Sequence, residues 1–183
     1  MSAITSRTWS LAELNALPAE EFAERVGAIF ERSPWIAERA AMGRPWESAD
    51  TLLKSMQEIV ATAPLDRKLA LISAHPDLGG RIARQGQVTA ESTAEQASAG
   101  LTRIDSATRK RIDDLNTAYR ERFGFPFIIC ARLNNVKTII GAMERRLNNG
   151  SEQEVSTALT EISKIARLRL MDLLGPDGQA PRQ

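Results

Sequence analysis

Proton-transfer chemistry in this chain would fall to His75, the only histidine, which is followed by the turn Pro76-Asp77-Leu78-Gly79-Gly80. Histidine is the one side chain whose ordinary pKa lets it both accept and donate a proton near neutral pH. Two interpretations of His75 are open. Its ring could act as a general acid or base, or it could pack at a helix end and hydrogen-bond a backbone carbonyl.

A second polar pair, Glu95-Gln96, follows His75 a short way along the sequence. The carboxylate accepts hydrogen bonds and the amide both donates and accepts, which suits a polar heterocycle with urea-like and carbonyl edges. The alternative is a solvated helix surface. The flanking residues are all small, so another molecule could approach this backbone closely: Ala94, Ala97, Ser98, Ala99 and Gly100.

Arg169 falls on the apolar face of the last predicted helix, one turn after Ile165 and one turn before Leu173. A guanidinium in that position extends to solvent, pairs with a buried carboxylate or reaches into a polar pocket. A pocket that also contained Glu95 would account for both residues.

The single cysteine, Cys130, lies in the apolar run Phe127–Ala131 and is interpreted as a buried, unreactive thiol. One cysteine excludes an intramolecular disulfide, which fits a reducing compartment. One cysteine and one histidine argue against a zinc site, and no Asp-rich loop supports magnesium or calcium, so we expect no metal.

Helices must position these residues, because apolar residues recur at helical spacing and strand patterns are poor. His75 is expected at a helix end, since a residue before proline is pushed out of the α region. Ser106 is predicted to cap one helix, and Ser151-Glu152-Gln153-Glu154 to form a capping box for another. The fold class is all-α, with about eight to nine helices, including segments near 18–30, 34–42, 48–62, 65–74, 90–100, 106–123, 136–147 and 151–174.

The composition indicates one compact domain. With 183 residues and 43% hydrophobic side chains, we expect a single domain over 1–183 with short loose ends at about 1–8 and 176–183. The 24 basic and 23 acidic residues are dispersed, so no nucleic-acid partner is expected. No stretch is long enough to span a membrane and the first residues lack the apolar core of a secretory signal, which favours the cytoplasm.

Four motifs occur in series between His75 and Leu170. They are His75-Pro76-Asp77-Leu78, Ser92-x-x-Glu95-Gln96-x-Ser98-x-Gly100-Leu101, Asn116-x-x-Tyr119-x-x-x-Phe123-Gly124-Phe125-Pro126-Phe127-Ile128, and Glu161-Ile162-x-Lys164-Ile165-Ala166-x-Leu168-Arg169-Leu170. Together they resemble the OHCU decarboxylase family, and the similarity extends from about Leu11 to Leu174. Its members convert 2-oxo-4-hydroxy-4-carboxy-5-ureidoimidazoline (OHCU) to (S)-allantoin, the last step from urate.

The resemblance implies an all-α, cofactor-free enzyme that is usually a homodimer and whose partner is its small-molecule substrate. It implies catalytic roles for His75, Glu95 and Arg169. The implied substrate contacts, many of them through backbone groups, are Pro76, Ser92, Thr93, Ala94, Glu95, Gln96, Phe127, Ile128, Ile129, Cys130 and Ala131.

Two other functions stay open from the sequence. One is a non-catalytic helical module that binds a ligand or serves as a scaffold. The other is a decarboxylase or lyase that acts on a related ureido acid. Stereospecific formation of (S)-allantoin without added metal would separate the expected enzyme from both.

Overall fold

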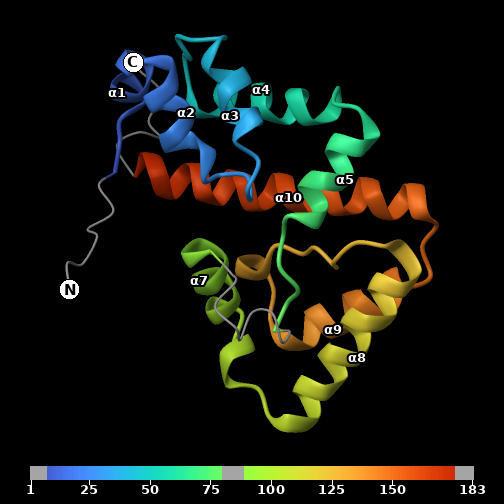
Figure 1. Cartoon of the computed structure of the whole chain (residues 1–183). Coiled ribbons are helices and arrows are strands. Elements are labelled where there is room, and N and C mark those ends of the chain that lie inside the picture. Colours follow the sequence, from blue (N-terminus) through green and yellow to red (C-terminus); the bar gives the residue numbers. More distant parts are fainter. Residues whose placement is uncertain (1–7, 80–88, 176–183) are drawn as a thin grey trace. The chain divides into compact units, whose positions relative to one another are not determined.

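The computed structural model of the protein describes residues 8–79 and 89–175. Those residues form nine α-helices and two short 3₁₀ helices, and they contain no strand, which confirms the all-α prediction (Figure 1). The chain divides into two compact units, residues 1–68 with 163–183 and residues 69–162. The single domain expected over 1–183 stays a prediction. Gly80 and most of the expected loose ends lie outside the described residues.

The first unit contains α1 (Leu11–Ala16), α2 (Ala19–Gly27), α3 (Pro34–Ala41), α4 (Ala49–Ala61) and the C-terminal part of α10 (Ser151–Leu174). Helices α2 and α3 lie side by side in it (Figure 1). The large aliphatic and aromatic side chains of the predicted 18–30 and 48–62 helices are buried. The buried residues include Phe22, Val26, Ile29, Phe30, Leu52, Leu53, Met56, Ile59 and Val60.

Helix α1 has no counterpart among the predicted helices. It is a six-residue helix with one buried side chain, Leu14, so its apolar period is too short to recognise. A capping box starts it: Ser10 Oγ accepts from the Glu13 N–H at 3.1 Å, and the Glu13 carboxylate accepts from the Ser10 N–H at 2.8 Å.

The second unit contains α7 (Ala90–Ser98), η1 (Leu101–Arg103), α8 (Ser106–Phe123), η2 (Ala131–Leu133), α9 (Val136–Arg146) and the N-terminal part of α10. Helix α5 (Leu65–Ser73) spans the boundary between the units in sequence. Helix α7 contacts η1 and η2, and α8 contacts α9 (Figure 1). The core of this unit includes Leu71, Ile72, Ile112, Leu115, Tyr119, Phe127, Ile139, Met143 and Ala158.

Two predicted helix starts need correction. Helix α8 is capped by Asp105 and not by Ser106, because Asp105 Oδ1 accepts from the Thr108 N–H at 2.7 Å. At α10, Glu154 does not serve a capping box. Its carboxylate is fully buried and accepts from Arg146 Nε at 2.8 Å, since a buried carboxylate gains more from a cationic partner than from a helix end.

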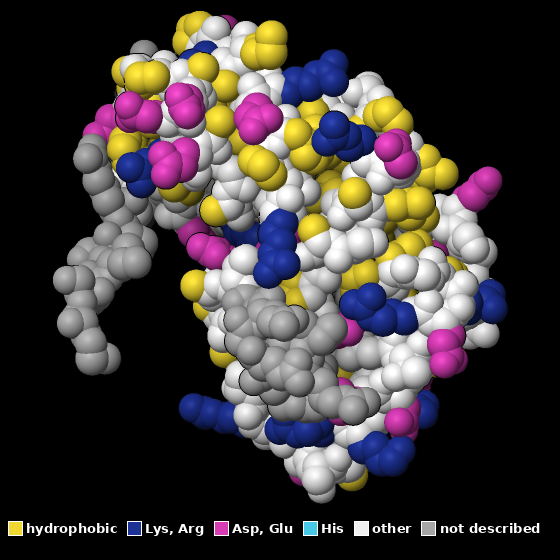
Figure 2. All heavy atoms as spheres, viewed as in Figure 1, with side chains coloured by type: hydrophobic (Ala, Val, Ile, Leu, Met, Phe, Trp, Pro, Cys, Tyr) yellow, Lys and Arg dark blue, Asp and Glu magenta, His cyan; other side chains and the backbone are white. Residues whose placement is uncertain are grey.

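Charged side chains are spread over the surface. On the face in Figure 2, Lys and Arg side chains are dispersed among acidic and polar ones, in keeping with the net charge of +1. Among the described helices, none has both the length and the apolar character that crossing a membrane requires.

Gly124 ends α8 in the left-handed region, with φ 79°, while its N–H donates to Arg120 O at 2.8 Å. A Cβ atom there would meet no atom within 4 Å, so the cost of Gly124→Ala is backbone strain alone. We expect this change to lower the free energy of unfolding by about 1–2 kcal/mol in urea titrations. Gly27→Ala, at the last residue of α2 and without a positive φ, should instead raise it by up to about 0.5–1 kcal/mol. Equal effects at both sites would contradict the prediction.

Candidate active site

His75 is held just beyond the end of α5. Its backbone N–H donates to Ile72 O at 3.2 Å, and its side chain is buried. Ring atom Nδ1 lies 2.9 Å from Leu71 O. A carbonyl only accepts, so Nδ1 carries a hydrogen, and Nε2 carries the lone pair of the neutral ring. The hydrogen bond to a backbone carbonyl that is expected of a packed histidine therefore also orients the ring for proton transfer. A packing role and a role in proton transfer are both compatible with the structure.

The turn after His75 is tied to α7 by Gln96. The Gly79 N–H donates to Gln96 Oε1 at 2.9 Å, and Gln96 Nε2 donates to Asp77 O at 3.4 Å. Gly79 has φ 58°, a conformation that glycine adopts without strain. Both ends of the buried Gln96 amide thus contact this turn. That Gln96 contacts the substrate stays a prediction. Its hydrogen bonds in the structure hold the turn after His75 against α7.

Helix α8 supports the same turn. Asn116 Nδ2 donates to Leu78 O at 3.0 Å, and Arg120 Nε donates to the Asp77 carboxylate at 3.0 and 3.1 Å. Asn116 belongs to one of the four motifs, but the spacing of that motif does not predict the hydrogen bond of Asn116 to Leu78 O. The pairing of Asp77 with Arg120 was not predicted, because the two residues are distant in sequence and only the fold joins them.

The residues predicted on α7 differ in their burial. Ser92 and Gln96 are buried, Glu95 is half-buried, and Thr93 and Ala94 are exposed. Glu95 and Gln96 therefore do not form a uniformly solvated helix surface. Gln96 points to the turn of His75, while Glu95 retains partial access to solvent.

The segment Phe127–Ala131, here called the 127–131 segment, is buried throughout and adopts no regular structure before η2. The Cys130 N–H donates to Glu161 Oε2 at 2.9 Å, so this backbone group already has a partner. Burial raises the pKa of the Cys130 thiol, and the charges of Glu161 and Glu95 raise it further. The predicted buried thiol is confirmed, and helix α7, which carries Glu95, contacts η2 at the end of this segment.

Arg169 pairs with a buried carboxylate, one of the three arrangements considered from its helix face. Arg169 Nη1 lies 3.1 Å from Glu31 Oε2 and donates to Ala28 O at 3.3 Å. The side chains of Arg169 and Glu31 are both buried, and both residues belong to the first unit. Glu31 was missed because it follows an apolar stripe with no motif around it. A catalytic role for Arg169 stays a prediction.

The second unit therefore brings three predicted elements together: the turn of His75, helix α7 and the 127–131 segment. They provide a histidine with a defined tautomer, a half-buried carboxylate and a buried backbone segment, a set suited to proton transfer on a small polar molecule. In the part of the chain that the structure describes, no group of three or more His, Cys, Asp or Glu side chains is arranged to hold a metal ion.

Comparison with known proteins links this geometry to a family. The model of the OHCU decarboxylase family matches residues 15–171. Over 164 residues the chain is 41% identical to 2-oxo-4-hydroxy-4-carboxy-5-ureidoimidazoline decarboxylase of Amia calva, covering 90% of this chain and 94% of the relative. It is 38% identical over 163 residues to a uric acid degradation bifunctional protein of Bacillus sp. (strain TB-90), covering 89% of this chain and 32% of that protein.

A solved structure has a similar fold. The crystal structure of (S)-allantoin synthase aligns with a TM-score of 0.74 and 30% sequence identity, covering 91% of this chain and 54% of that one. The all-α architecture described above is thus shared with a protein of known structure.

Gln96→Leu should destabilise the protein, because it leaves the buried Gly79 N–H without its acceptor. We expect the free energy of unfolding to fall by about 1–3 kcal/mol in urea titrations. Gln153→Leu is the matched control, since Gln153 is exposed on α10, and it should stay within about 0.5 kcal/mol of the parent. The same unfolding midpoint for both variants would show that the turn does not depend on Gln96.

Glu31→Gln should lower the stability further than Gln96→Leu, since it removes the Glu31 carboxylate from its buried pair with the Arg169 guanidinium. Removal of one partner of a buried pair costs about 3–5 kcal/mol, which thermal and urea unfolding would both detect. Asp50→Asn breaks the exposed pair with Arg167, whose atoms lie 3.5 Å apart, and should cost less than about 1 kcal/mol. Similar losses for the two variants would contradict the importance of the buried pair.

Proposed function

The chain belongs to the OHCU decarboxylase family, and on that premise we propose that His75, Glu95 and Arg169 carry out its reaction. The protein is a carboxy-lyase that decarboxylates OHCU to allantoin in urate degradation. The observation that best supports the proposed site is the double hydrogen bond of Gln96 to Gly79 and Asp77. It joins the turn that follows the histidine to the helix that carries the carboxylate.

The substrate contains its own electron acceptor. When the bond between the carboxylate and the hydroxyl-bearing ring carbon breaks, CO₂ leaves and the electron pair forms a double bond to the neighbouring imine carbon. The imine π pair moves to nitrogen, which takes up one proton. The hydroxyl then loses its proton as a carbonyl forms, and the former imine carbon gains a proton. The balance is one proton consumed and one CO₂ released, and we propose that no cofactor takes part.

His75 is assigned to proton transfer at the hydroxyl or carboxyl group of the substrate. Its Nδ1–H is engaged with Leu71 O, so in the neutral ring the lone pair for accepting a proton is on Nε2. A ring held in one tautomer needs no reorientation before the transfer, which lowers the entropic part of the barrier.

The remaining roles concern binding and charge. We assign Glu95 to orientation of the substrate ring, and Gln96 with the backbone of the 127–131 segment to the ureido and carbonyl edges. Pro76 and residues 92–94 would complete the contacts. Arg169 would balance the negative charge of the substrate, although the structure describes it through its pair with Glu31 in the first unit. The (S) configuration of the product follows in this proposal from protonation on one face.

Assembly and location are also proposals. Membership of the family favours a homodimer, as expected from the sequence. A single cysteine, Cys130, with no possible internal disulfide is compatible with the reducing cytoplasm.

The assigned roles predict a steep loss of turnover in two variants. His75→Ala should lower kcat about 10²- to 10⁴-fold, the usual contribution of a general acid or base. Glu95→Gln, which keeps the side-chain shape, should also lower kcat/KM, whereas Glu91→Gln at an exposed position of the same helix should not. The measurement is the rate of (S)-allantoin formation from freshly generated OHCU, with circular dichroism to show that each variant is folded.

Two results would contradict these assignments. Parental turnover in a folded His75→Ala protein would remove His75 from the mechanism, and equal rates for the Glu91 and Glu95 variants would remove Glu95. Racemic allantoin formed by the unmodified protein only at the spontaneous rate would instead favour a binding module, and a panel of related ureido acids would test a different lyase substrate.

A further inference from the structure

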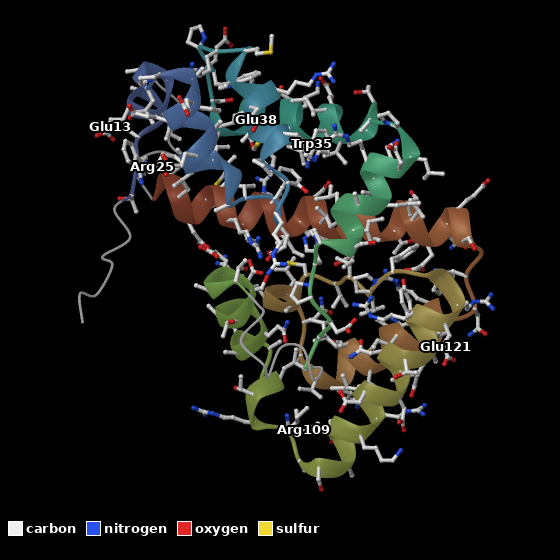
Figure 3. All side chains as sticks on the ribbon, viewed as in Figure 1. Glu13, Arg25, Trp35, Glu38, Arg109 and Glu121 are labelled. Atoms are coloured by element: carbon white, nitrogen blue, oxygen red, sulfur yellow. The ribbon has the colours of Figure 1, made fainter. Side chains whose placement is uncertain are left out.

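A buried polar cluster surrounds Glu154 in the second unit. It consists of Tyr119 on α8, Arg146 at the end of α9, Asn149 just before α10, and Glu154 on α10, and we call it the Glu154 cluster. Arg109 and Glu121 mark the ends of α8, which supplies the tyrosine (Figure 3).

The Glu154 carboxylate is the centre of this cluster. Its side chain is fully buried, and it accepts from Arg146 Nε at 2.8 Å, from Asn149 Nδ2 at 2.7 Å and from the Tyr119 hydroxyl. Burial raises the pKa of the Tyr119 phenol above its ordinary value, and its hydrogen bond to Glu154 raises it further. Tyr119 therefore stays protonated near neutral pH and acts as a donor to the carboxylate.

Arg146 connects this carboxylate to the 127–131 segment. While Nε bonds Glu154, Nη1 donates to Ile128 O at 2.7 Å. Its guanidinium carbon lies 4.3 Å from the centre of the Phe127 ring, and that ring meets the Tyr119 ring edge-on at 5.2 Å. One planar cation thus contacts a side chain and a backbone carbonyl at the start of the segment.

The other end of the segment is held separately. The Cys130 N–H donates to Glu161, and Asn134 Nδ2 donates to Cys130 O at 3.0 Å. Between these points the backbone belongs to no helix or sheet ladder. Side-chain hydrogen bonds therefore contribute to its conformation, since regular secondary structure does not determine it.

We propose that Arg146, oriented by Glu154, is a positioning residue that holds the 127–131 backbone in the conformation that binds the substrate. The inference rests on the proposed function, which assigns substrate contacts to this segment. Arginine suits the task, because its rigid fork bonds a carboxylate and a carbonyl at once, whereas a lysine ammonium has no such planar geometry.

Stability alone does not account for the pair. The Arg146 and Glu154 side chains are 12% and 0% exposed, and the desolvation of such a pair offsets much of its attraction. Apolar residues of the same size would fill the space at similar stability. What they would not supply is a directed donor to Ile128 O, so the geometry of the segment is the property that depends on this arginine.

The test compares Arg146→Lys with Arg145→Lys, the same change at the exposed neighbouring position of α9. Cys130 is the only cysteine and lies inside the segment, so the rate at which a thiol reagent modifies it reports on opening of the segment. In Arg146→Lys we expect this rate to rise roughly fivefold to tenfold, the equivalent of about one lost hydrogen bond. KM for OHCU should rise about tenfold with a smaller change in kcat, as for lost binding contacts. Arg145→Lys should alter neither.

Tyr119→Phe is the second variant, and it carries the test if Arg146→Lys does not fold. It removes one donor to Glu154 and leaves Arg146 in place, so it should shift both measurements in the same direction by less. Unchanged thiol reactivity and unchanged KM would overturn the inference. Faster thiol modification with unchanged KM would also overturn it, and would show that the segment does not bind substrate, whereas loss of turnover in His75→Ala tests the proposed function independently.

Discussion

Buried backbone outside the helices must still find hydrogen-bond partners, and in the unit that contains His75 side chains supply several of them. Among the described residues, the turn after His75 and the 127–131 segment are held in this way. Gln96 on α7 and Asn116 on α8 form hydrogen bonds with backbone groups of the turn. Arg146 on α9 and Glu161 on α10 form hydrogen bonds with backbone groups of the segment. The helices thus serve as rigid carriers for polar side chains, and the irregular stretches they hold are those assigned to the substrate.

This division of labour suits a reaction whose electron acceptor is part of the substrate. The protein then has to orient a polar ring, exclude water from the carboxylate and place one proton, and each task depends more on geometry than on unusual reactivity. The raised pKa of Cys130 is consistent with that picture, because it keeps the thiol beside the proposed site unreactive. His75, with its ring hydrogen-bonded to Leu71 O, is the group that we propose for this proton transfer.

Periodicity and turn chemistry predicted the longer helices, but they did not predict the short helix α1 or the buried polar pairs. The helix from 48 to 62 and the break at Pro76 follow from local rules, so they could be predicted. Glu154 was wrongly predicted to complete a capping box, because the local sequence fits that pattern. Its actual partner, the Arg146 guanidinium, is brought near only by the fold. The hydrogen bond between Gln96 and Gly79 could not be predicted, because the sequence alone does not bring that turn next to α7. The resemblance to a family supplied the substrate, which no spacing of residues could name.

The pair of Glu31 and Arg169 also bears on the order in which the protein is made. The two residues are 138 positions apart, yet they belong to the same unit, and the whole second unit lies between them in the chain. On the ribosome, Glu31 emerges long before Arg169 is synthesised. The buried pair cannot form until translation has reached Arg169 on α10, and by that point every residue of the second unit has already been synthesised.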